Sequence, residues 1–170
     1  KSAIDLINNW EEIKNISNNS LNININEKIK INEADIEKNK GNECMKVGDI
    51  KEAILHYDNA IKIDPFNCVY YTNKSKALYD LKDYIKSIEE TNIAIDINIK
   101  FTKAYYRRSK ANEALGNILS ACCDMFIVLN NEYDLLIEKE LNTLIKKLNS
   151  MINLQPLELN YILKSGKIFI

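Results

Sequence analysis

The sequence of 170 residues is long enough for one domain with a buried core, and its charged residues (28%) nearly cancel to a net charge of −1. Such a balance gives no overall field that would draw the protein to nucleic acid or to a membrane surface. The sequence also has no run of about eighteen apolar residues that would predict a membrane span, and no segment with the composition of a signal peptide.

The four cysteines, Cys44, Cys68, Cys122 and Cys123, show neither CxxC spacing nor a histidine at metal-binding spacing. Disulfide frameworks belong to small secreted domains, so we expect buried, reduced thiols and a cytoplasmic protein. We expect no metal and no cofactor. Because the chain opens at Lys1 without Met, we also expect it to be an excerpt from a longer protein.

The first 32 residues are predicted to form an N-terminal helix and an Asn-rich linker. An amphipathic helix over residues 3–16 is indicated by one apolar stripe, which consists of Ile4, Ile7, Trp10, Ile13 and Ile16. Residues 21–25 alternate apolar residues with Asn, and we interpret them as filler rather than as a strand.

From residue 33 onward, apolar residues recur at three- and four-residue spacing, and the whole chain has only two prolines and four glycines. This pattern is typical of an all-α protein. Six helices are predicted, over Glu33–Val47, Asp49–Ile63, Val69–Leu81, Tyr84–Asp96, Phe101–Leu115 and Ile118–Leu129. Turn residues separate them, and Pro65 ends the second helix because proline cannot continue it.

The six helices form three helix pairs with a repeat of roughly 34 residues, starting at Ala34, Cys68 and Thr102. Small residues recur at matching places in the two helices of each pair: Gly41 and Ala53, Ser75 and Ser87, Ser109 and Ala121. Small side chains let paired helices approach closely, while each pair buries its apolar face by stacking on the next.

Residues 133–151 have the composition of a capping helix. Its apolar face is predicted to consist of Leu136, Ile137, Leu141, Leu144, Ile145 and Leu148. A terminal cap is needed to cover the last repeat, so we expect one repeat domain with its cap over residues 33–151. Residues 152–170 form a C-terminal extension, with a predicted helix over Leu157–Leu163 and an apolar end that packs back on the domain or leads into further sequence.

Three segments, Glu37–Asn42, Tyr70–Ser75 and Lys103–Arg108, resemble the tetratricopeptide-repeat (TPR) co-chaperones that carry a two-carboxylate clamp. The resemblance covers residues 34 to about 133. It implies a three-repeat TPR superhelix of six helices, with the C-terminal capping helix and short flanking helices. It also implies an interaction module that binds the C-terminal Glu-Glu-Val-Asp tail of heat shock protein 90, heat shock protein 70, or both.

In that family, five polar positions hold the terminal carboxylates, and they correspond here to Lys38, Asn42, Asn73, Lys103 and Arg107. Where the family commonly has an aromatic residue three places after the first Asn, this chain has Met45. Methionine is apolar and adaptable, so the resemblance still implies an apolar peptide pocket at Met45, with the choice of chaperone left open.

The residue types support this assignment independently. Lys38 and Asn42 are four residues apart, as are Lys103 and Arg107, so each pair shares one helix face. Cations and amide donors together suit a chain-terminal carboxylate. Arg107 is informative because the chain otherwise uses Lys for positive charge, whereas Arg108 faces elsewhere and is interpreted as rim or inter-helix packing.

Three other interpretations remain open at this point. In the first, the chain is a TPR scaffold that binds another protein or an internal peptide. In the second, it forms homo-oligomers through residues 4–16 or its apolar end, although we expect a monomer. An enzyme is disfavoured, because the only histidine, His56, lies beside the core position Tyr57 and no phosphate loop or nucleophile motif is present. A catalytic domain outside this sequence is compatible with all of these observations.

Overall fold

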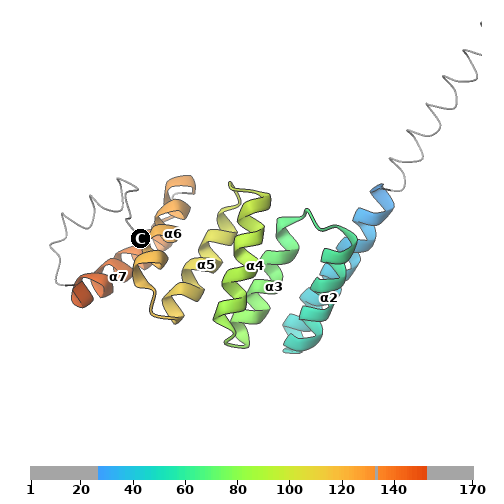
Figure 1. Cartoon of the computed structure of the whole chain (residues 1–170), viewed down its shortest axis with the longest axis horizontal. Coiled ribbons are helices and arrows are strands. Elements are labelled where there is room, and N and C mark those ends of the chain that lie inside the picture. Colours follow the sequence, from blue (N-terminus) through green and yellow to red (C-terminus); the bar gives the residue numbers. More distant parts are fainter. Residues whose placement is uncertain (1–26, 133, 153–170) are drawn as a thin grey trace, which may run out of the picture.

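A computed structural model describes residues 27–132 and 134–152, which form helices and no strand. The first described helix covers residues 27–47. It is followed by α2 (Ile50–Ile63), α3 (Cys68–Asp80), α4 (Tyr84–Ile97), α5 (Thr102–Ala114), α6 (Ile118–Asn131) and α7 (Leu135–Ile152). The helices stand side by side in chain order (Figure 1), which confirms the all-α repeat architecture.

The bounds of α2 to α7 agree with the predicted ones to within two residues. The first helix differs, because it is already helical at residue 27 rather than beginning at Glu33. The residues between, among them Glu27, Lys28 and Lys30, are good helix formers that extend the helix into solvent. The helices predicted over residues 3–16 and Leu157–Leu163, and the segment 21–25, lie outside the described residues.

The turn inside each helix pair has one residue in the left-handed conformation. Gly48 has φ 85° and Gly116 has φ 83°, and at the corresponding place Lys82 has φ 64°. Asp49 and Asp83 then cap α2 and α4, since their carboxylates accept hydrogen bonds from the backbone N–H of Glu52 and Lys86. The three turns therefore share one geometry, which glycine adopts without strain and lysine does not.

The small residues do bring the paired helices together. A Cβ atom on Gly41 would lie 2.6 Å from Cε1 of Tyr57, so no larger residue fits there without displacing that ring. In the next two pairs a serine hydroxyl also bridges the helices, as Ser87 Oγ donates to the carbonyl of Ser75 and Ser109 Oγ donates to that of Ala121, each at 2.9 Å.

The predicted cap is confirmed, with one correction. Leu141, Leu144 and Leu148 of α7 are buried against α6, in a cluster that also contains Ile118. Leu136, predicted on the same apolar face, is 63% exposed. It lies in the first turn of α7, one residue before Ile137, and therefore about 100° away from the packed side of the helix.

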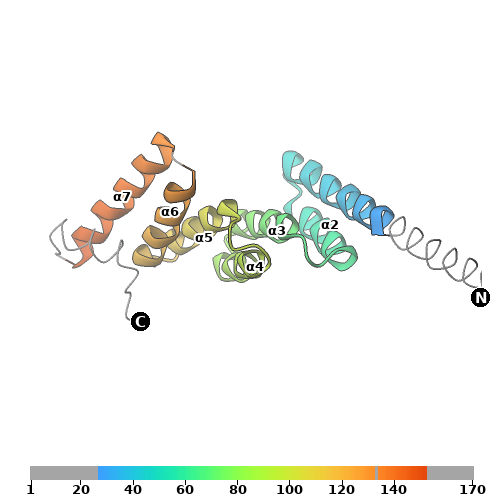
Figure 2. The ribbon, with the colours of Figure 1, turned by 90° about the horizontal axis from the view of Figure 1, so that it is seen from above.

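Seen from above, the chain curves (Figure 2). The helix over residues 27–47 and α7 rise at the two ends, α3 and α5 cross the middle, and α4 lies on the opposite, outer side. The first helices of the three pairs consequently share the inner surface. Of the described helices, none has the length and apolar character that crossing a membrane requires.

All four cysteines are free, as predicted, but only Cys68 and Cys122 are buried; Cys44 and Cys123 are partly exposed, which corrects the prediction of four buried thiols. Burial raises the pKa of the Cys122 thiol to about 12, so this side chain behaves as a small apolar core residue. The described residues contain no group of His, Cys, Asp and Glu side chains that could hold a metal ion.

Candidate functional site

The five predicted site residues lie on the three inner helices. Lys38 and Asn42 belong to the helix over residues 27–47, Asn73 to α3, and Lys103 and Arg107 to α5. The structure brings three of them together around a central cavity of about 190 Å³, which is lined by Asn42, Met45, Tyr57, Asn73, Lys76 and Arg107. Lys38 and Lys103 lie one helical turn before Asn42 and Arg107, on the same helix faces.

The two amides of the site are joined by hydrogen bonds. Tyr57 donates its hydroxyl to Oδ1 of Asn42 at 2.8 Å, and Nδ2 of Asn73 donates to the same oxygen at 3.3 Å. Burial raises the pKa of Tyr57 to about 12, so its hydroxyl remains a donor at neutral pH. Because Oδ1 of Asn42 already accepts these two hydrogen bonds, the NH₂ group of Asn42 is the part of the amide that can donate to a ligand.

Lys38 is half-buried and held by a neighbour on its own helix. Its Nζ lies 2.8 Å from Oδ1 of Asp35, which also accepts a hydrogen bond from the Tyr70 hydroxyl at 3.2 Å. The hydrogen bond from Lys38 lowers the pKa of Asp35, so that this carboxyl is charged at neutral pH. Because an ammonium has three donors, Lys38 is positioned by Asp35 and still has donors for a ligand.

Arg107 is the most unusual residue of the inner surface. Its Nε is buried and has no hydrogen-bond partner, and among the described residues no carboxylate forms an ion pair with its guanidinium. Burial lowers the pKa of Arg107, although an arginine remains charged at any physiological pH. A buried donor without a partner is costly, and the positively charged side chain of Arg107 lines an open cavity, so the site favours an anionic ligand.

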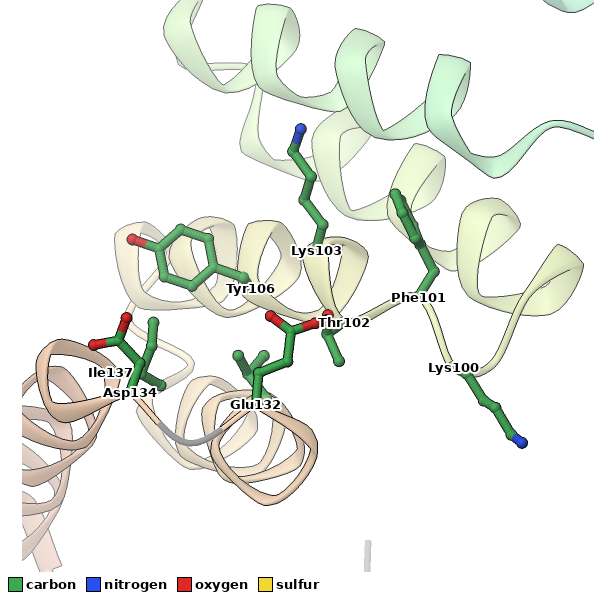
Figure 3. Close-up of a pocket in the computed structure, with 9 residues that line it drawn as sticks. Lys100, Phe101, Thr102, Lys103, Tyr106, Glu132, Asp134 and Ile137 are labelled. Atoms are coloured by element: carbon green, nitrogen blue, oxygen red, sulfur yellow. Dashed lines mark hydrogen bonds between the residues drawn. The ribbon is translucent and has the colours of Figure 1, made fainter.

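Lys103 is exposed and lines a second cavity of about 530 Å³ between α5 and the segment before α7. Figure 3 shows its ammonium pointing away from Glu132 and Asp134, the two carboxylates of that cavity. In the part of the chain that the structure describes, no carboxylate is within ion-pair distance of Lys103. Its charge is therefore available to a ligand on the inner surface.

Two neighbouring residues have structural roles. Arg108 forms two hydrogen bonds to the buried carboxylate of Asp124 on α6, at 2.8 and 3.0 Å, and one to Asn92 on α4. Of the two interpretations for Arg108, inter-helix packing is therefore the correct one. His56 likewise packs between helices, with its Nδ1 2.8 Å from Oε2 of Glu37.

Two residues of the central cavity are not predicted as site residues from the sequence. Tyr57 is predicted as a core residue alone, but its hydroxyl reaches the inner surface through Asn42. Lys76 is not predicted, because a lysine carries little information in so lysine-rich a chain. Its spacing was the available signal, since Lys76 follows Asn73 by three residues just as Met45 follows Asn42.

Stacked helix pairs with a polar inner surface define a helical-repeat protein. The tetratricopeptide repeat family model matches residues 34–67. Human RNA polymerase II-associated protein 3 is 34% identical over 131 residues, which cover 75% of this chain and 19% of that protein. The first TPR of Spaghetti (RPAP3), bound to the HSP90 peptide SRMEEVD, is 34% identical with a TM-score of 0.66; the match covers 68% of this chain and 92% of that one.

The second TPR domain of human RPAP3, in complex with the HSP70 peptide SGPTIEEVD, is 28% identical with a TM-score of 0.60, over 64% of this chain and 91% of that one. The chain belongs to the tetratricopeptide-repeat family. It spans between 13% and 20% of the length of curated relatives such as RNA polymerase II-associated protein 3, so the likeness concerns this domain.

Proposed function

We propose that this chain is a co-chaperone-type interaction module that binds the C-terminal Glu-Glu-Val-Asp tail of heat shock protein 90, heat shock protein 70, or both. Two TPR domains that it resembles are bound to peptides with this ending, SRMEEVD and SGPTIEEVD. The observation that carries the proposal is the buried, unpaired Nε of Arg107, a residue that lines the cavity beside the amides of Asn42 and Asn73.

A chain-terminal aspartate has two carboxylates, and the inner surface has donors for both. Lys38, Asn42 and Asn73 bind one from the side of the first two repeats, and Lys103 and Arg107 bind the other from α5. Each charge-assisted hydrogen bond contributes about 1.5–3 kcal/mol when well aligned. Ordering the peptide offsets much of this sum, so we expect a Kd of roughly micromolar order.

The proposal describes a non-catalytic adaptor in the cytoplasm that acts as a monomer and has no cofactor. Any catalytic activity would belong to other parts of a longer protein. Met45, on the apolar side of the central cavity, is proposed to contact a side chain of the peptide.

The proposal is tested by calorimetry with SRMEEVD and SGPTIEEVD, each as a free acid and with its C-terminus amidated. We expect both free acids to bind and amidation to remove most of the affinity, because the terminal carboxylate is lost. Lys38→Met and Arg107→Met should abolish detectable binding, while Lys46→Met, which changes an exposed lysine outside the cavity, should not. Equal binding of acid and amide would instead favour a TPR scaffold that binds an internal peptide.

A further inference from the structure

The central cavity combines apolar and cationic surfaces. Met45 and the ring of Tyr57 form apolar parts of its wall, whereas Lys76 and Arg107 add two positive charges. None of the described residues that line it has a carboxylate. Such a cavity suits a side chain with an aliphatic stem and an anionic end, because the stem is buried against carbon atoms and the carboxylate meets charged donors.

Lys76 continues the inner surface one turn beyond the clamp. It lies three residues after Asn73 on α3, so both side chains are on the same helix face. Arg107 reaches the cavity from α5 on the other side. Because Lys76 lines the same cavity as Asn42 and Arg107, a peptide whose terminal carboxylates are bound there has its preceding residues within reach of Lys76.

The ammonium of Lys76 forms an ion pair whose carboxylate a ligand can replace. It forms an ion pair with Asp80, one turn further along α3, and the two side chains are 41% and 29% exposed. Ion pairs of this kind on a helix surface contribute little, since both groups are well hydrated when apart. An incoming carboxylate can therefore exchange with Asp80 at small cost.

We propose that Lys76 forms a subsite for one of the two glutamate side chains in Glu-Glu-Val-Asp, next to the terminal carboxylate that Arg107 binds. This inference rests on the proposed function, and it adds a residue that selects for acidic sequence before the terminus. Lys76 is then a specificity-determining residue, distinct from the residues that bind the terminal carboxylates.

The test is calorimetry on the full chain and Lys76→Met with three peptides: SRMEEVD and two versions in which one glutamate is replaced by glutamine. In the unsubstituted chain we expect one of the glutamine peptides to bind about threefold to fivefold more weakly, as for a partly exposed charge pair. Lys76→Met should bind SRMEEVD more weakly by the same factor. Its affinity for that glutamine peptide should equal the affinity of the unsubstituted chain for the same peptide. Asp80→Asn should tighten binding of SRMEEVD more when Lys76 is present than in Lys76→Met, where only the longer-range effect of Asp80 on Arg107 remains.

Lys46→Met is the matched control, because Lys46 also pairs with a carboxylate on its own helix but lies outside the cavity. It should bind all three peptides as the unsubstituted chain does. Equal weakening of all three peptides by Lys76→Met, or no weakening at all, would overturn the subsite and leave the proposed function intact. Failure of the unsubstituted chain to bind any free-acid peptide would overturn both.

Discussion

At the scale of single residues, the inner surface depends on side chains whose orientation is fixed by a neighbour. Asp35 holds Lys38, and Tyr57 fixes which way the Asn42 amide points. An asparagine amide exposes a donor at one end and an acceptor at the other, so its orientation decides whether it attracts or repels a carboxylate. Arg107, in contrast, has no such partner at its buried Nε.

We predict that Tyr57→Phe weakens binding of SRMEEVD about fivefold, because the loss of one hydrogen bond of about 0.5–1.5 kcal/mol frees the Asn42 amide to turn. Calorimetry gives the affinity, and thermal unfolding gives the stability. Tyr71→Phe is the control, since it removes a hydroxyl that donates to the carbonyl of Pro65. It should affect stability without affecting affinity, and equal affinities in the two variants would contradict the role of Tyr57.

Arg108 stabilises the fold rather than the ligand. We predict that Arg108→Ala lowers the free energy of unfolding by about 3–5 kcal/mol, because the carboxylate of Asp124, 6% exposed, loses its partner in the interior. Urea unfolding measures this loss. A variant that also carries Asp124→Asn should recover part of it, and a stability unchanged by Arg108→Ala would show that the pair is dispensable.

At the scale of elements, the turns inside the helix pairs have one common geometry and unequal sequences. Gly48 and Gly116 fit the left-handed conformation that the turns require, and Lys82 has to adopt it with a side chain. The helix ends around these turns were predictable because capping and turn residues act locally. The start of the first helix at residue 27 was not predictable, because the Asn-rich composition of the residues before 33 hides the helix formers among them.

We predict that Lys82→Gly stabilises the protein by about 0.5–1 kcal/mol. Glycine removes a left-handed strain that costs about 1–2 kcal/mol. This gain in free energy exceeds the loss caused by the extra conformational entropy that glycine gives the unfolded chain. Thermal unfolding should show a higher Tm. Gly48→Lys provides the reverse experiment and should lower the Tm by a similar amount, while a Tm unaffected by either change would contradict the strain.

At the scale of the whole molecule, three helix pairs and a cap place charges from residues 38 to 107 on one curved inner surface (Figure 2). We predict that binding of SRMEEVD weakens by about tenfold when salt rises from about 0.1 M to about 1 M, as three cations each lose about 0.5 kcal/mol to screening. Calorimetry at both salt concentrations measures this. The Tm of the free protein in the same buffers is the control, and affinity independent of salt would contradict recognition by charge.

The helices, their pairing and the cap could be predicted from the sequence, because period, small residues and turn residues are local signals that repeat every roughly 34 residues. The five candidate positions came from the resemblance of three segments to the TPR co-chaperones. What surrounds those positions could be learned only from the folded structure. The shared oxygen of Asn42, the partner of Arg108 and the place of Lys76 in the cavity each depend on which residues of different helices meet. Such contacts between distant segments leave no periodic trace in a single sequence, since they are fixed only when the repeats stack.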